Sequence, residues 1–422
     1  MPLARAPRAA AWFTVCGSGV SMIIDVDTHW EATAYEPGHH PLEGFQDRLP
    51  APLDRLAFAL AGDLLAGLPD ARRPAAATLI PHLAGGGVDD KGPPTIHPRH
   101  NSTSAERVGW MDRLGIDHSL VNPGGYWQMI EFMPDVRAKA AARCNDYLAE
   151  QLADHADRLH LMTIVDLADI DGAIAELARM RAKGSRGFFL YTEQGRPGGG
   201  ISPGHPRLDR LWDAAFDLGM LAVLHVGNTA ADFTGWADLG WDEPDGAGHG
   251  GLLRFANVQR SRTCELYLHA MLYGGVFARH PDLTVLVAEL RTNWLASFVE
   301  RCEASTVPSL ALGPWPYERS GGQMIRENVR FTPLPGFGDT GTIDLLQRYP
   351  DMLVFSSDYP HQEGNAEPIE LYQPALDELD AELRASFLGE NITACFARTG
   401  DPLRGRPAPD SPVGNSDRYS HP

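Results

Sequence analysis

Short apolar runs recur along the chain and alternate with longer segments in which apolar and polar positions follow a helical period. The strand-like runs lie at residues 22–27, 119–122, 159–165, 187–191, 220–225, 284–289, 329–332 and 353–357. Apolar residues at three- and four-residue spacing predict helices at residues 105–114, 134–156, 170–182, 206–218, 264–278, 294–305 and 381–394. Alternation of strands with helices is typical of βα units and a parallel sheet. Eight such strands predict an α/β protein built as a single-domain (β/α)8 TIM barrel.

Glycines support this division of the chain. Gly115, Gly184 and Gly219 each follow the end of an expected helix and precede an apolar run. Glycine readily adopts the left-handed conformation that ends a helix and turns the chain into the next strand.

Three segments exceed the minimal repeat: residues 33–101, 227–261 and 306–327, which contain many Gly and Pro residues and, in the last two, Trp. The first two follow strands, so we expect them at the carboxyl rim of the barrel as lids or binding loops. For residues 84–101 a disordered insertion stays open as an alternative. The barrel is expected to span 22–400, between a disordered extension at 1–21 and a disordered polar tail at 401–422.

The charge balance limits the classes of partner. Lys and Arg total 36 against 55 Asp and Glu, a formal charge of −19, which disfavours nucleic acid and anionic membranes. A small-molecule substrate is therefore expected, and the outer helices of a barrel leave room for a homo-oligomer. No run approaches the ~20 apolar residues of a membrane span.

Cysteine usage and the N-terminus bear on the compartment. The five cysteines are scattered without a Cys-x-x-Cys pair, which indicates neither a disulfide framework nor a thiolate zinc site. Arg5, Arg8 and the apolar residues 9–15 only weakly imitate a signal peptide, because the run is short and no cleavage site follows. The sequence favours a cytoplasmic protein.

Four residues at strand ends form a candidate metal site. Asp27 and His29 end the first expected strand, His225 ends the fifth, and Asp358 follows the eighth. Side chains two apart on a strand share a face, and the first and last strands of a barrel are neighbours at the rim that carries active sites. Two carboxylates and two imidazoles suit one divalent ion and leave a position for water or substrate.

The chain also resembles a known family, through a series of short pieces in order. These are DVDTH at 25–29, MDRLGID at 111–117, NDYL at 145–148, LAVLH at 221–225, GGVFARHP at 274–281 and FSSDYPH at 355–361. From Ile23 to about Arg398 the chain resembles the amidohydrolase-related family of metal-dependent barrel enzymes, which includes aminocarboxymuconate semialdehyde decarboxylase and other aromatic-acid decarboxylases and hydrolases. The resemblance implies a metal-dependent barrel enzyme.

Two departures from the family pattern affect the chemistry. Asp27 and His29 stand where many members have a His-x-His pair, which makes the site harder and more anionic; zinc is still the first expectation, with manganese or iron as alternatives. Glu289 stands where the family commonly has the histidine of a His-Gly-Gly. It could act as a general base, support a ligand histidine, bind a second metal, or simply pair with Arg291. His361 is a further acid, base or ligand candidate, or it orders its loop.

A ring of residues just after strands is expected to line a substrate pocket. Aromatic rings there would form apolar walls, and the planar fork of Arg291 would clamp a substrate carboxylate. The expected substrate-binding residues are Trp30, Tyr126, Trp127, Tyr191, Arg291, Asn293 and Trp294.

These residues leave several functions open. A single ion would activate water for hydrolysis, or hold a substrate for non-oxidative decarboxylation, with Asp358, Glu289 and His361 as the catalytic acid and base groups. A dinuclear monooxygenase, with two iron ions or a manganese/iron pair, is the alternative, and Glu31, Glu289 and His361 would hold its second metal. A non-catalytic partner subunit is a further alternative, because the usual strand-six histidine is missing.

Overall fold

A seven-stranded parallel sheet organises the protein, as seen in a computed structural model. The structure describes residues 22–30, 42, 45, 103–124, 130, 135–191, 201–226, 251–307, 313–334, 339, 341–360 and 367–405, without the side chains of 191, 251–258 and 260. The strands follow each other in chain order: β1 (Ile23–His29), β2 (Ile116–Asn122), β3 (Leu159–Thr163), β4 (Gly187–Tyr191), β5 (Leu221–His225), β6 (Val285–Ala288) and β7 (Val329–Phe331). Every neighbouring pair is parallel, which confirms the predicted α/β class.

The eighth predicted strand differs from expectation. Residues 353–357 do not form a regular strand; the chain there pairs through isolated bridges, Phe331 with Leu353 and Thr28 with Tyr359. Val354 N donates to Phe331 O (3.0 Å), and Val26 N donates to Phe355 O (3.1 Å). Ser357 N donates to the Asp25 side chain and not to a strand carbonyl, and Asp358 then turns the chain with a φ of 53°. This stretch still joins β7 to β1, so the two edges of the sheet are bridged.

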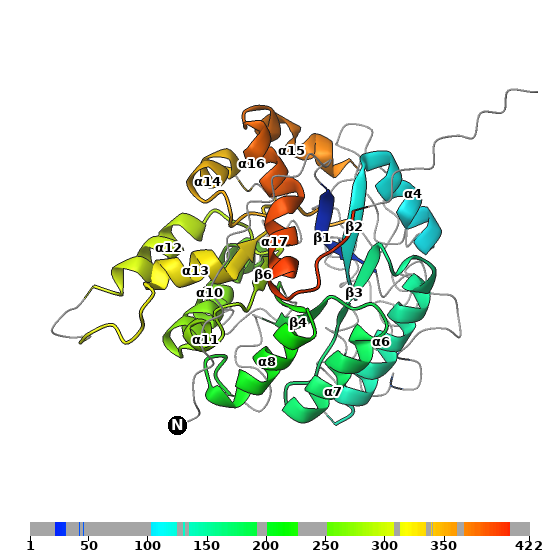
Figure 1. Cartoon of the computed structure of the whole chain (residues 1–422), viewed down its shortest axis with the longest axis horizontal. Helices are drawn as coiled ribbons and strands as arrows, with labels where there is room; N and C mark the ends of the chain where they lie inside the picture. Colours follow the sequence, from blue (N-terminus) through cyan, green and yellow to red (C-terminus); the bar gives the residue numbers. More distant parts are fainter. Residues whose placement is uncertain are drawn as a thin grey trace, which may run out of the picture.

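Helices surround the strands on the outside (Figure 1). They are α4 (Ser104–Leu114), α6 (Arg137–Leu152), α7 (Ile170–Arg181), α8 (Asp209–Asp217), α10 (Gly251–Tyr273), α11 (Val276–Arg279), α12 (Leu295–Ala304), α13 (Gly321–Asn328), α14 (Thr342–Arg348), α15 (Pro368–Asp377), α16 (Ala381–Ala385) and α17 (Asn391–Arg398). Short 3₁₀ turns η3 (Ala153–His155) and η5 (Pro206–Leu208) and the π-turn η7 (Ser386–Glu390) complete the described elements.

Several helices were not predicted, and α13 shows why. It lies within the expected irregular segment 306–327 and begins with Gly321 and Gly322, which disfavour helix on propensity alone. A side chain at Gly321 would meet the carbonyl of Cys302, so close packing on α12 requires the glycine. Similarly, α10 begins inside the expected rim segment 227–261, and α14 and α15 were missed.

The hydrophobic core has two parts. The larger lies between the sheet and the outer helices. The smaller, here called the inner cluster, fills the enclosed face of the sheet and is capped by residues of α17 and beyond. Its members are Ile24, Val26, Leu120, Met162, Phe189, Leu221, Val223, Leu286, Ala288, Val354, Ile392, Cys395, Phe396 and Leu403.

Helix α17 closes the amino ends of the strands. Arg186, just before β4, stacks over the Phe396 ring at 4.7 Å, and Arg398 donates to Thr284, just before β6. A Cβ at Gly389 would collide with the carbonyl of Met22 at the start of β1. In Figure 1, α17 accordingly lies in front of the centre of the strands.

The chain after α17 also makes defined contacts. The tail was expected to be disordered from 401 onward, but Asp401 pairs with Arg181 and Arg186, and His118 Nε2 lies 2.8 Å from Arg404 O. Residues 406–422, like the extension at 1–21, lie outside the described residues.

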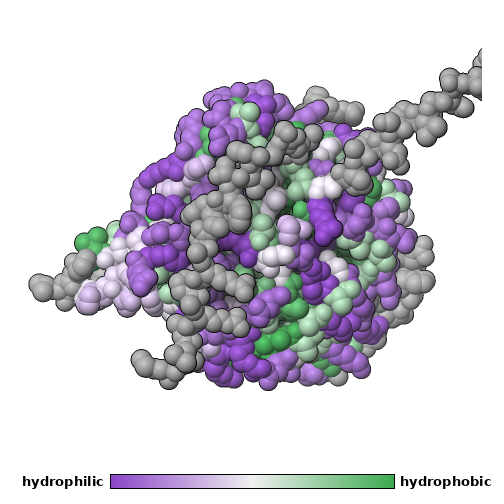
Figure 2. Space-filling view, in the orientation of Figure 1, coloured by the Kyte–Doolittle hydropathy of each residue, from purple (hydrophilic) through white to green (hydrophobic). Residues whose placement is uncertain are grey.

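Two surface properties complete the description. Polar residues cover most of the coloured surface in Figure 2, and apolar residues appear there in separate patches. Among the described residues, no helix combines the length and apolar character needed to cross a bilayer.

Candidate metal centre

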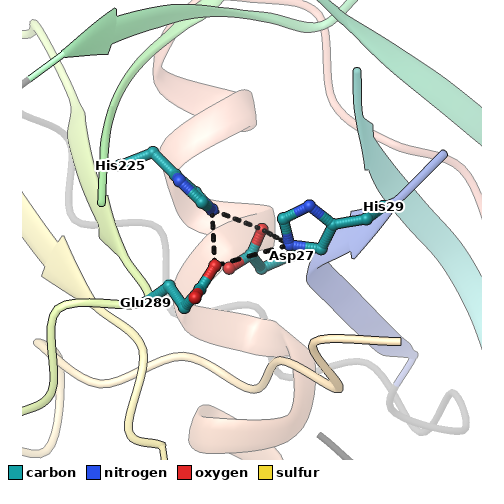
Figure 3. A group of neighbouring side chains, drawn as sticks. All are labelled: Asp27, His29, His225 and Glu289. Carbon is teal, nitrogen blue, oxygen red and sulfur yellow. Dashed lines mark ion pairs between the residues drawn. The ribbon is translucent and has the colours of Figure 1, made fainter. Parts of the chain in front are cut away.

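Four buried side chains converge at the carboxyl ends of the strands (Figure 3). Asp27 and His29 end β1, His225 ends β5, and Glu289 follows β6. Each offers one ligand atom, and these atoms all lie within 4.8 Å of one another. The ends of parallel strands meet at one rim, which is why residues so distant in sequence come together.

A β-bulge on β1 aims Asp27 and His29 into this group. Asp25 pairs with Ser119 and Thr28 pairs with Val121, so two residues of β1 face the single residue Leu120 of β2. An extra residue reverses the alternation of faces beyond it. The inner cluster takes Ile24 before the bulge and Val26 within it, and the enclosed face then receives Asp27 and His29.

The distances within the group suit one shared cation. His225 Nε2 lies 3.1 Å from Glu289 Oε2 and 3.7 Å from Asp27 Oδ1. His29 Nε2 lies 3.5 Å from Asp27 Oδ1 and 3.7 Å from Glu289 Oε2. Ligands bound at roughly 2.0–2.2 Å to one ion have separations of this order. The His225 Nδ1–H donates to Val226 O (2.7 Å), which turns Nε2 toward the carboxylates.

Asp358, expected as the fourth ligand, lies at the edge of the group. Its Oδ1 is 3.1 Å from His29 Nε2, and its main-chain N–H donates to Asp27 O at 2.9 Å. Glu289 occupies the fourth position of the compact set, so the structure brings together five buried acid and imidazole groups.

Residues with left-handed backbone also lie at this metal centre. Among the described residues, the non-glycine residues with positive φ are Glu289 (55°), Arg291 (61°) and Asp358 (53°). Each costs on the order of 1–2 kcal/mol relative to ordinary backbone. Strain of this kind persists where surrounding contacts over-determine the conformation, and it concentrates at functional sites.

Buried carboxyl groups dominate the electrostatics. Burial raises the pKa of Asp27 well above its ordinary value; the nearby His225 opposes this shift, and the Asp358 and Glu289 carboxyls add to it. Burial also raises the pKa of Asp25 to about 7, although the hydrogen bonds from Ser357 oppose the shift. The buried acids therefore create a strong demand for positive charge.

His225 responds to that demand. Burial by itself lowers the pKa of His225, but the Asp27 and Glu289 carboxylates outweigh it and raise the value to about 9. A divalent cation satisfies the same demand without burying protons, and imidazole nitrogens with carboxylate oxygens are a donor set for manganese, iron or zinc. The residues present therefore fit one divalent ion.

Two supporting residues were missed by the sequence analysis. Asn122 Nδ2 donates to Asp27 Oδ1, and its place at the end of β2 is a signal that could have identified it. Arg107 on α4 is fully buried; its Nη2 donates to His29 O (2.8 Å), and its guanidinium stacks on the Tyr359 ring at 4.2 Å. A helix position gives no comparable signal, so Arg107 could not be distinguished from an ordinary surface arginine.

The expected substrate-binding residues are placed unevenly. Trp30 is buried, and the Trp294 ring packs in the core against Phe298 and Phe331. Arg291 is half-buried and Asn293 exposed. The remaining candidates cannot be placed: the side chain of Tyr191 is not described, and the residues outside the described part of the chain are Glu31, Tyr126, Trp127 and His361.

Sequence comparisons match the chain to one family and to two similar decarboxylases. The profile of the amidohydrolase family matches residues 24–398. The gamma-resorcylate decarboxylase of a Rhizobium species is 26% identical over 266 residues, covering 61% of this chain and 76% of that protein. The gamma-resorcylate decarboxylase of Rhizobium radiobacter is 27% identical over 267 residues, with the same coverage of 61% and 76%.

Solved structures share the fold. An amidohydrolase from Mycobacterium avium subsp. paratuberculosis has a TM-score of 0.62 at 20% identity, covering 89% of this chain and 99% of that one. The 5-carboxyvanillate decarboxylase of Sphingomonas paucimobilis has a TM-score of 0.56 at 17% identity, covering 90% and 99%. A dihydroxybenzoic acid decarboxylase from a Polaromonas species, solved with manganese and 2-nitroresorcinol, has a TM-score of 0.54 at 16% identity, covering 90% and 97%.

Proposed function

This chain belongs to the amidohydrolase family, and from that premise we propose that it is a metal-dependent carboxy-lyase acting on a small hydroxylated aromatic acid. The observation that carries the proposal is the buried group of Asp27, His29, His225 and Glu289. The decarboxylase names of the relatives favour loss of carbon dioxide over hydrolysis. Decarboxylation and hydrolysis would both make the protein a metal-dependent enzyme.

The four grouped residues would hold one divalent ion, with Asp358 beside them. Two carboxylates in the set, and a third adjacent, favour manganese over zinc, and a fold relative was solved with manganese. When bound, the ion would polarise the carboxylate of the substrate and the hydroxyl oxygen next to it.

The side chains supply the proton chemistry and the orientation. Cleavage of the bond between ring and carboxylate leaves an electron pair on the ring carbon, which must take up a proton as carbon dioxide departs. Asp358 is buried beside His29 and is our candidate for this acid. Water at the rim would then return its proton, and the hydroxide left behind would combine with the released carbon dioxide as bicarbonate. Arg291, half-buried in the turn after β6, would orient an anionic substrate through its planar fork.

We also propose that the barrel is closed by an eighth strand and that the enzyme is cytoplasmic. Residues 352–359 serve as the eighth strand of a (β/α)8 barrel, on the basis of their hydrogen bonds to β7 and β1. The charge balance predicts a small-molecule substrate and no nucleic-acid or membrane partner, and cysteine usage predicts a cytoplasmic location. These expectations stay predictions.

Hydrolysis is the second candidate, because the same group could activate a water molecule. The dinuclear oxygenase needs a second set of ligands. Of its three predicted residues, Glu289 already belongs to the ligand group of the first ion, and Glu31 and His361 lie outside the described residues. A non-catalytic subunit is disfavoured because the ligand group is complete.

The test combines metal analysis with an assay of carbon dioxide release. Protein purified without added metal is analysed for its elements, depleted by chelation, reloaded with manganese, and incubated with a panel of 2-hydroxy- and 2,6-dihydroxybenzoates. We expect about one ion per chain and metal-dependent release of carbon dioxide. Cleavage of ester or amide substrates without decarboxylation would favour the hydrolase, and a protein that binds no metal would refute the proposal.

A further inference from the structure

We propose that Asp339 is a positioning residue for the metal centre, acting through the turn that carries Glu289 and Arg291. The inference rests on the proposed metal site and names a residue that controls it from outside the ligand group. Asp339 lies after β7, apart from the strand ends that supply the ligands.

The turn after β6 needs external support. Within four residues, 289–292, two non-glycine residues adopt left-handed backbone: Glu289 at φ 55° and Arg291 at φ 61°. Left-handed backbone is strained for residues that carry a side chain, so the turn would relax if its surroundings did not hold it. Glycine adopts such backbone without this strain, so the side chains at Glu289 and Arg291 increase the need for holding contacts.

Asp339 supplies two of those contacts, and a third to the stretch after β7, with one oxygen. Its Oδ2 accepts from Thr292 N (2.7 Å), Thr292 Oγ1 (2.9 Å) and Leu334 N (3.1 Å). Hydrogen bonds to an ionised carboxylate are about twice as strong as neutral ones. Because Asp339 is only 7% exposed, water competes little for them. The carboxylate thus ties the turn after β6 to the stretch after β7.

The other end of the turn is held separately. Glu289 N donates to Thr332 Oγ1 (3.2 Å), and the Trp294 indole donates to Leu290 O (3.0 Å). With Thr292 fixed by Asp339, both ends of the strained turn are anchored. The Glu289 backbone then aims its carboxylate at His225, 3.1 Å away.

The expected consequence is a change in metal affinity. Moving a ligand carboxylate by a fraction of an ångström weakens its bond to the ion, and loss of an outer residue that orients a ligand typically costs roughly 10- to 100-fold in affinity. A residue that only stabilises the fold would lower the melting temperature and leave the affinity unchanged.

The experiment compares four variants with wild type: Asp339→Ala, Asp339→Asn, Thr292→Val and Asp344→Ala. Manganese dissociation constants are measured by competition with a fluorescent chelator, and melting temperatures are recorded with and without manganese. We expect Asp339→Ala to weaken manganese binding by roughly 10- to 100-fold. Asp339→Asn keeps an oxygen acceptor in place and should rescue most of the affinity. Asp344 is exposed on α14 in the same stretch of chain, so Asp344→Ala should match wild type.

Thr292→Val keeps the shape of the side chain and removes one of the three donors, so it should fold and weaken binding by a smaller factor. It decides the question if Asp339→Ala does not fold. Wild-type affinity in folded Asp339→Ala, or in Thr292→Val when the alanine variant does not fold, would overturn the inference. Absence of metal binding in wild type would overturn the proposed function as well, and the wild-type measurement alone identifies that case.

Discussion

Polar groups are partnered differently at the two ends of the strands. At the carboxyl ends, Asp27 and Glu289 place carboxylates within 3.1–3.7 Å of His29 and His225, in a region where every group is buried. At the amino ends, His118 Nδ1 lies 3.1 Å from His160 Nε2, and the Asp401 carboxylate is matched by Arg181 and Arg186.

This difference suggests that the carboxyl ends serve function and the amino ends serve stability. The carboxyl end concentrates acidic groups and strained backbone, which a folded protein tolerates only for a purpose. At the amino end two imidazoles pair with each other and two arginines meet one carboxylate, around the apolar face of α17. Barrel enzymes commonly divide their two faces in this way. Substitutions at the two ends should therefore change different measurements.

The largest effect is expected from Asp27→Asn at the carboxyl end. Loss of a ligand carboxylate should remove the metal and reduce kcat/KM by roughly 10³-fold or more, the scale of about 4 kcal/mol of transition-state stabilisation. The metal-free variant should melt no lower than metal-free wild type, because one of several clustered negative charges is removed. Enzyme kinetics and calorimetry test both parts. A variant that keeps its activity but melts much lower would contradict the comparison.

The next effect is expected from Phe396→Ala at the amino end. Phe396 is fully buried in the inner cluster under the Arg186 guanidinium, so its truncation should cost about 3–5 kcal/mol of unfolding free energy. Manganese affinity of the folded variant should stay at the wild-type value. Denaturant unfolding and metal titration measure the two quantities. A large loss of affinity would show that the ends are coupled and not separate.

A smaller, pH-dependent effect is expected from His160. Burial, followed by the neighbouring His118, lowers the pKa of His160 from 6.5 to about 3. The unfolded chain therefore binds a proton at this residue once the pH falls below 6.5, and the folded protein does not until about pH 3. Stability should be complete above pH 6.5 and decline below it, by about 2 kcal/mol at pH 5 for this group.

His160→Gln isolates that contribution. Glutamine carries no titrating proton and keeps a donor toward His118. The stability difference between wild type and variant should shrink by about 2 kcal/mol between pH 7.5 and pH 5, as measured by urea unfolding. An unchanged difference across that range would mean that His160 is protonated in the folded protein.

Much of the difference between the two ends could be predicted from the sequence, because the metal-ligand candidates lie at the ends of strands. Asp27, His29 and His225 end apolar runs, and parallel strands bring their ends to one rim. The alternation of apolar runs with helical segments also predicted the seven strands. Helix α13 was missed because its two glycines disfavour helix on propensity, although Gly321 is required for close packing on α12.

The unpredicted part of the site depends on contacts that a one-dimensional pattern does not carry. Glu289 was recognised as a departure from the family, but its left-handed backbone and its place in the ligand group required coordinates. Arg107 and Asp339 act through a carbonyl, through main-chain N–H groups and through a neighbouring hydroxyl, and no spacing rule links them to the ligands.

The bridge between the first and last parts of the sheet has a consequence during protein synthesis. Ser357 N donates to Asp25 Oδ1 across 332 residues of chain, so β1 cannot find this neighbour until the intervening chain has left the ribosome. At about 5–20 residues per second the wait is roughly 15–70 seconds. During that interval one edge of β1 and the apolar face later covered by α17 have no native cover, which makes the nascent chain a natural client for chaperones.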